Sequence, residues 1–82
     1  MAELTHTDVG CAFRELRLRR RLTVAAAASA AGLSAGHVSA IECGRARNPR
    51  FVTLVRLSGA LDARLSEVID LAAKRAETRQ RG

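Results

Sequence analysis

The chain has 82 residues, which is enough for one small domain with a single core and too few for a second core or a deep enzymatic cleft. Its net charge is +6, and thirteen arginines and one lysine supply the positive charges. Only Phe13 and Phe51 are aromatic, so the chain lacks the stacking platform on which single-stranded nucleic acids bind. These features favour a double-stranded polyanion as the partner.

Composition also excludes several other classes of protein. No apolar run approaches the length of a membrane span, and the first residues lack the basic and apolar regions of a signal peptide. Cys11 and Cys43 have neither CxxC spacing nor a metal-site arrangement with His6 or His37, so we interpret them as reduced thiols, with a redox switch as the alternative. We expect a cytoplasmic, nucleoid-associated protein without enzymatic activity, metal, cofactor or membrane contact.

Helical spacing predicts two helices in the first part of the chain. The first is expected at residues 9–20, with Asp8 as its N-terminal cap, because four apolar residues recur at that spacing: Val9, Ala12, Phe13 and Leu16. Thr23 is a suitable cap for a second helix at 24–30, which is nearly all alanine. Gly32 can adopt the left-handed conformation that ends this helix.

Three further helices are predicted in the second part. Ser34 caps a helix at 35–43, and a proline-containing loop follows at 45–50. A helix at 51–61 is expected to direct five apolar side chains inward: Phe51, Leu54, Val55, Leu57 and Leu61. The last helix is expected to begin at Ser66, with an acidic residue in its first turn.

All five helices share one predicted core, and no strand is expected, so the fold class is all-α. The predicted core residues are apolar and recur at helical spacing: Phe13, Leu16, Leu22, Ala28, Leu33, Val38, Ile41, Leu54, Leu57, Leu61 and Val68. We divide the chain into an N-terminal arm at 1–8, a helical domain at 9–73 and a basic tail at 74–82 that is expected to fray.

Residues 31–42 form a tight turn and a short helix directly after the alanine-rich helix, which is typical of a DNA-binding helix-turn-helix. Over about residues 9–70 the chain resembles the Cro and lambda-repressor-like, or XRE-like, family of bacterial and phage regulators. The resemblance rests on an ordered set of features: Leu16-Arg17, Leu22-Thr23, Ala28, Gly32-Leu33-Ser34, Val38, Ile41-Glu42, Gly44, Asn48-Pro49 and Leu54 through Leu61. It implies a compact five-helix DNA-binding domain whose second and third helices form the helix-turn-helix.

The resemblance implies roles for residues around the third helix. Arg17 and Glu42 match the positions of a largely buried ion pair, which makes both structural. The positions that enter the major groove to read bases are Ala35, Gly36, His37, Ser39 and Ala40. This set is mostly alanine and glycine, so His37 and Ser39 are its only polar side chains. His37 is expected either to contact a base or, as the alternative, to be solvated. Small residues here favour water-mediated contacts and recognition of DNA shape.

The resemblance also implies phosphate contacts on both sides of the third helix, at Arg21, Val24, Ala25, Arg45, Arg47 and Arg50. Many relatives have a phosphate-binding glutamine where this chain has Val24, so the free amides of Val24 and Ala25 are expected to bind in its place. Arg21 replaces a common glycine, so a strained backbone is expected there. A merely solvated basic loop at 45–50 is the alternative.

Family members usually bind inverted repeats as twofold homodimers, with half-sites about 34–36 Å apart. The last helix is the expected interface, through five apolar residues: Leu65, Val68, Ile69, Leu71 and Ala72. An adaptor or antitoxin is the alternative function, with a toxin or a sigma factor as its main partner and with DNA binding secondary. A phage repressor, a restriction-modification controller and an antitoxin all fit the sequence.

Overall fold

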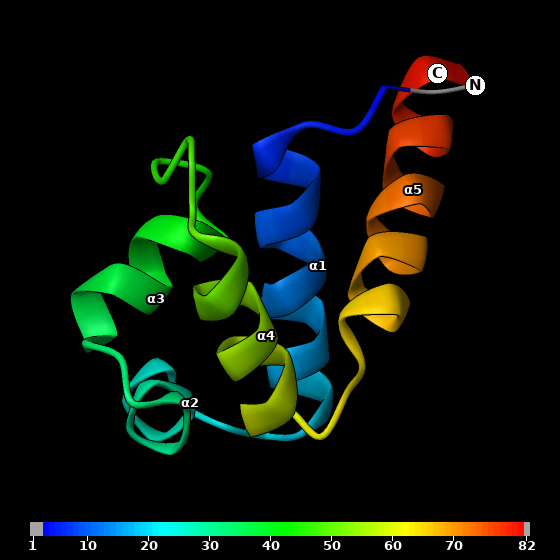
Figure 1. The fold of residues 1–82 in the computed structure, drawn as a ribbon. Helices are drawn as coiled ribbons and strands as arrows, with labels where there is room; N and C mark the ends of the chain where they lie inside the picture. Colours follow the sequence, from blue (N-terminus) through cyan, green and yellow to red (C-terminus); the bar gives the residue numbers. More distant parts are fainter. Residues whose placement is uncertain (1–2, 82) are drawn as a thin grey trace.

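The computed structural model describes residues 3–81, and these form five helices and no strand (Figure 1). In chain order the helices are α1 (His6–Arg19), α2 (Val24–Ala31), α3 (Ala35–Glu42), α4 (Phe51–Ala60) and α5 (Leu65–Arg81). The predicted all-α fold is confirmed for this part of the chain. Residues 1–2 and Gly82, which belong to the predicted arm and tail, lie outside the described residues.

Helix α1 begins earlier than the sequence predicts, at His6. Its cap is Thr5, whose hydroxyl accepts a hydrogen bond of 3.1 Å from the Asp8 amide. The Asp8 carboxylate in turn accepts one of 3.1 Å from the Thr5 amide. This reciprocal capping box makes Asp8 a first-turn residue of the helix and not its cap. The prediction of an arm at 1–8 is therefore wrong for residues 6–8, which are helical.

Helices α2 and α3 form a helix-turn-helix, with a bend of 111° between them. The predicted caps Thr23 and Ser34 are confirmed, since the hydroxyl of each accepts an amide hydrogen bond of 3.0 Å. Gly32 ends α2 with φ of 70°, a left-handed conformation in which most side chains are strained. Within residues 3–81 no single helix is long and apolar enough to cross a membrane, and α2 and α3 meet that criterion only as a bent pair, by length and composition alone.

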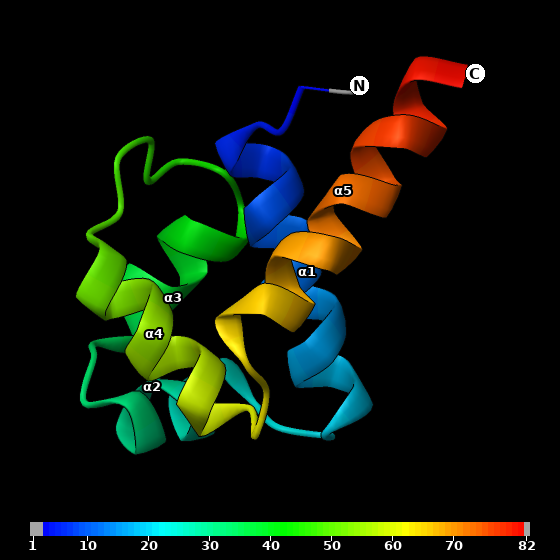
Figure 2. The same cartoon turned by 45° about the vertical axis from the view of Figure 1, so that its right-hand side comes forward.

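Helix α1 lies between α3 and α5 and packs against both, while α4 packs against α2 and α5. Figures 1 and 2 show α1 and α5 side by side, with α2 and α3 on the opposite side of α1 from α5. Helix α5 continues to Arg81, so residues 74–81 are helical, in contrast to the predicted frayed tail. This arrangement places the helix-turn-helix at one side of the molecule.

The core contains side chains from every helix, and its largest fully buried apolar members are Phe13, Leu57, Val38 and Val68. Small residues such as Ala12 complete it and let the helices approach closely. Four residues predicted for the core are only half-buried and pack against it: Leu16, Leu22, Leu33 and Leu54.

Two helices direct apolar side chains differently from the prediction. On α4, Phe51 and Val55 were expected inward but are exposed, because the helix meets the core through the face that carries Leu57. On α5, Val68 and Ala72 are fully buried within the single chain. The prediction that these two residues form a dimer interface is therefore wrong.

Candidate nucleic-acid interface

A buried ion pair joins α1 to the end of α3. The Arg17 guanidinium donates two hydrogen bonds to the Glu42 carboxylate, from Nε to Oε2 at 2.7 Å and from Nη2 to Oε1 at 3.0 Å. Its Nη1 donates to the carbonyl oxygen of Leu22 at 2.7 Å, just before α2. The hydrogen bond to Glu42 raises the pKa of Arg17, although burial acts in the opposite direction. The pair implied by the family resemblance is thus present, and it fixes the end of α3 to α1.

Helix α1 also contacts α3 through a glycine. A methyl group added at Gly10 would lie 2.1 Å from the carbonyl oxygen of Ile41, which is backbone and cannot turn aside. Only a residue without a side chain lets α1 approach the C-terminal end of α3 this closely. Gly10 and the Arg17 to Glu42 pair together set the position of α3 in the molecule.

One side of α3 is anchored in the core by Val38 and Ile41. The remaining surface of the helix carries the five positions predicted to read bases, the first three exposed and the last two half-buried: Ala35, Gly36, His37, Ser39 and Ala40. Most of these side chains are small, so the backbone of α3 can approach a partner closely.

Cys43 belongs to the same surface, and sequence reasoning missed it. This residue caps the C-terminus of α3 and is exposed. It follows Ser39 by one helical turn and Gly36 by two, so the three lie on one side of the helix. Its spacing from Gly36 and Ser39 would have placed Cys43 on this surface, but from the sequence it was interpreted only as a reduced thiol or a redox switch.

The start of α2 offers backbone amides to a ligand. The side chain of Val24 packs against the core. The Thr23 hydroxyl accepts a hydrogen bond from the amide of Ala26. The amides of Val24 and Ala25, which belong to the same first turn, have no acceptor within the helix. Arg21, which precedes the cap, is exposed and has the expected positive φ, at 57°.

The loop between α3 and α4 carries three exposed arginines, Arg45, Arg47 and Arg50. The Arg45 amide donates to the carbonyl oxygen of Ala40 at 2.9 Å, which ties the loop to α3. Arg50 occupies the N-terminal cap of α4 and makes no capping hydrogen bond through its side chain. The first amides of α4 therefore have no acceptor within the helix and lie beside arginines, an arrangement that can bind an anion.

The segment 23–61, which contains the helix-turn-helix, carries no exposed carboxylate. Residues 23–61 contain one acidic residue, Glu42, and its carboxylate is buried against Arg17. The same segment contains four exposed arginines, the three of the loop and Arg56 on α4. Sequence reasoning did not include Arg56, because it lies apart from the two arginine clusters.

A family comparison agrees with this geometry. Residues 8–71, most of the chain, match the family described as helix-turn-helix domain. The chain belongs to this helix-turn-helix family. The Cro and lambda-repressor-like resemblance stated from the sequence is confirmed by this match and by similar solved structures. No curated protein sequence matches the chain.

Solved structures of regulatory proteins are similar to this helix-turn-helix chain. The restriction-modification controller protein C.AhdI from Aeromonas hydrophila is 32% identical, with a TM-score of 0.73, over 77% of this chain and 94% of that one. One structure of the clp gene regulator ClgR from Corynebacterium glutamicum is 29% identical, with a TM-score of 0.82, over 89% of this chain and 94% of that one. A second ClgR structure is 26% identical, with a TM-score of 0.89, over 98% of this chain and 84% of that one.

Proposed function

We propose that this helix-turn-helix chain is a sequence-specific regulator of transcription that places α3 in the major groove of double-stranded DNA. The observation that carries the proposal is the exposed, small-residue surface of α3 beside a surface with arginines and no exposed carboxylate. The match to regulatory proteins over most of the chain supports it. In this role the protein acts in the cytoplasm, on the nucleoid.

Base recognition in this proposal rests on few side chains. His37 donates to N7 or O6 of guanine, and Ser39 bonds to a base edge. Ala35 and Ala40 contact thymine methyl groups. Gly36 lets the backbone of α3 approach the bases, so ordered water and DNA shape supply part of the specificity.

Phosphate contacts hold α3 in the groove from both sides. We propose three arginines of the loop, one arginine before α2 and two amides of α2 as these contacts: Arg45, Arg47, Arg50, Arg21, Val24 and Ala25. Arg17 is excluded, because its guanidinium is occupied by Glu42 and by the carbonyl oxygen of Leu22. Neutralising phosphates releases counterions, so the affinity should depend on salt.

We further propose that the regulator binds an inverted repeat as a homodimer through α5. With Val68 and Ala72 in the core, the apolar part of this interface is reduced to the half-buried Leu65, Ile69 and Leu71. Half-buried residues contribute less apolar area than exposed ones, so the dimer is expected to be weaker than the sequence alone suggested.

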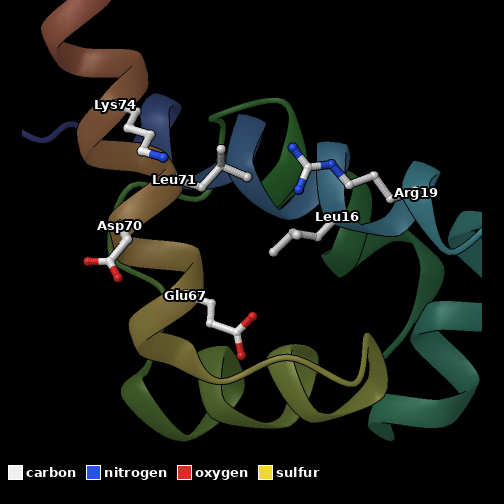
Figure 3. A pocket seen from close by; sticks show the side chains of 6 residues that line it. All are labelled: Leu16, Arg19, Glu67, Asp70, Leu71 and Lys74. Carbon is white, nitrogen blue, oxygen red and sulfur yellow. The ribbon is translucent and has the colours of Figure 1, made fainter.

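Charges beside Leu71 support self-association. A surface groove of about 280 Å³ lies between α1 and α5. Figure 3 shows Leu16 and Leu71 among the residues that line it. Both signs of charge line the same groove: Arg19 and Lys74, Glu67 and Asp70. A second copy related by a twofold axis can therefore place opposite charges against one another.

The salt dependence of DNA affinity tests the proposed function. Replacing Arg47 by alanine should weaken binding to all duplex sequences alike and reduce the slope of log K against log salt by about 1. The measurement is fluorescence anisotropy of labelled duplexes over a range of salt concentrations. Arg75→Ala is the matched control, because Arg75 is exposed on α5 away from the proposed contacts, and its slope should not change. A wild-type affinity that is weak and insensitive to salt would contradict DNA binding.

An adaptor or antitoxin that binds another protein is the second candidate function. The observation that favours it is the exposed apolar surface of α4, which the DNA-binding proposal does not use. An adaptor for which DNA binding is secondary would bind duplexes weakly at every salt concentration, so the same titration separates the two functions.

A further inference from the structure

One side of α4 is exposed although most of its residues are apolar. It consists of five positions at helical spacing, which we call the α4 stripe: Phe51, Val52, Val55, Arg56 and Gly59. The exposed fractions of the three large apolar residues are 69% for Phe51, 58% for Val52 and 44% for Val55. Single exposed apolar residues are common on small domains, whereas adjacent ones on one helix face mark an interaction site.

The α4 stripe continues into a groove between α2 and α4. This groove has a volume of about 660 Å³, and its lining consists of Arg56 and small residues of both helices, among them Ala30, Gly32 and Gly59. Figure 2 shows the C-terminal end of α4 beside α2 at this place. A side chain added at Gly59 would meet no atom within 4 Å. The backbone of a partner can therefore approach α4 more closely here than at the bulky Phe51.

Charge indicates which partner fits the α4 stripe. Arg50 precedes the stripe, Arg56 lies within it, and the one acidic residue of the segment 23–61 is the buried Glu42. A second copy docked here through the same face would set its arginines against those of the first, and the nearest carboxylate, that of Asp62 one turn beyond Gly59, already pairs with Arg20. Duplex DNA supplies negative charge, but its polar backbone would leave the three large apolar side chains without an apolar partner.

We propose that the α4 stripe binds an acidic amphipathic helix of another protein. Apolar side chains of that helix lie on Phe51, Val52 and Val55, and carboxylates beside them pair with Arg50 and Arg56. The ridge formed by the stripe fits between the ridges of a facing helix, and the small residues near Gly59 allow a close crossing. The base-reading positions of α3 are not part of this surface, and although Arg50 is also a proposed phosphate contact, the inference does not rest on the proposed DNA binding.

The test uses the full chain and a synthetic amphipathic helical peptide with leucines on one face and glutamates on both flanks. Titrated into isotope-labelled protein, the peptide should shift amide resonances of α4 and of the end of α2 and leave those of α5 unchanged. Val52→Ser should weaken its binding by about tenfold, as expected for an apolar residue at the centre of an interface. The matched control is Leu18→Ser, since Leu18 is 52% exposed on α1, outside the stripe, and its replacement should have no effect.

Charge reversal supplies the second arm of the test. Arg56→Glu should weaken binding of the glutamate peptide and strengthen binding of the same peptide with lysines on its flanks. Equal binding of both peptides to the wild type, or no shifts in α4, would overturn the proposal. A dimer in sedimentation that Val52→Ser dissociates would assign the stripe to a second copy instead. A loss of duplex affinity in Val52→Ser as large as in Arg47→Ala would assign it to DNA.

Discussion

Three arginines near the C-terminal end of α1 have carboxylate partners within the chain: Arg17 with Glu42, Arg19 with Glu15 and Arg20 with Asp62. The pair of Arg17 is buried, and the other two lie on the surface. An exposed ion pair contributes little to stability, whereas removing one partner of a buried pair leaves a charge without water or counterion. Only the pair of Arg17 is therefore expected to matter greatly for folding.

Glu42→Gln tests this difference. The replacement keeps the size of the side chain and leaves the Arg17 charge buried without a carboxylate, so the free energy of unfolding should fall by about 3–5 kcal/mol. Urea unfolding monitored by circular dichroism measures the loss. Glu15→Gln, which removes the exposed partner of Arg19, should change the free energy of unfolding by less than about 1 kcal/mol. Equal effects of the two replacements would contradict a structural role for the buried pair.

Asp8 is the other buried charged residue with a defined network. Burial raises the pKa of its carboxyl, but hydrogen bonds from the amide and hydroxyl of Thr5 and from Arg79 outweigh this and hold the pKa below its ordinary value. The hydrogen bond from Nη2 of Arg79 is 2.6 Å long, and it joins the end of α5 to the start of α1. The ionised carboxylate therefore stabilises the packing of these two helices.

The depressed pKa of Asp8 predicts the direction of a pH effect. A carboxyl group whose pKa is lower in the folded chain contributes stability above its unfolded pKa of about 3.9, and loses it as the pH falls through the folded pKa. Asp8→Asn should thus lower the free energy of unfolding at neutral pH by on the order of 1 kcal/mol, since Arg79 is half-exposed to solvent. Urea titrations should show this difference shrinking below about pH 4. If the free energies of unfolding of Asp8→Asn and the wild type differed by the same amount at every pH, the charge of Asp8 would not be what stabilises the folded chain.

At the scale of elements, the contact between α1 and α3 determines how the recognition helix is presented. The contact includes the close approach at Gly10 and the ion pair of Arg17, which lies two helical turns further along the same face of α1, and both act on the last turn of α3. The N-terminal half of α3 is left exposed by this arrangement. Displacing its C-terminal end should therefore tilt the proposed base-reading surface.

Gly10→Ala tests the importance of this approach. Its methyl group would overlap the Ile41 carbonyl oxygen, so α1 and α3 must separate, and the free energy of unfolding should fall by about 1–3 kcal/mol. Gly36→Ala is the control, because a side chain there meets no atom within 4 Å, and it should raise stability by about 0.5–1 kcal/mol through helix propensity. Thermal unfolding compares the two variants. A Gly10→Ala variant more stable than wild type would show that the close approach is not required.

Local sequence features predicted most helix ends, and tertiary contacts explain where they did not. Thr23, Ser34 and Gly32 act as predicted because capping depends on residues close in sequence. The start of α1 was misplaced, since Asp8 is a good cap in isolation but here completes a capping box with Thr5. The orientation of α4 was wrong in part, because apolar residues surround much of this helix and its periodicity does not select the face that meets the core.

At the scale of the whole molecule, the sequence predicted the five-helix fold and the element that carries the proposed site. It predicted less well which surfaces remain free, because that depends on how the helices pack. Val68 and Ala72 were assigned to a dimer interface but are buried, and Phe51 and Val55 were expected to point inward but are exposed. The apolar surface available to partners therefore moves from α5 to α4. The residues proposed to contact DNA are exposed or half-buried in the structure, and their contact with DNA stays a prediction.

Selection of bound sequences from a random duplex library tests the central claim most directly, because it reports DNA binding, specificity and symmetry together. The account predicts enrichment of one motif, arranged as an inverted repeat with half-sites about 34–36 Å apart. The same selection with His37→Ala should still enrich a motif but change the preferred base at one position of each half-site. Recovery of random sequences without enrichment by the wild-type chain would contradict the claim that α3 reads DNA.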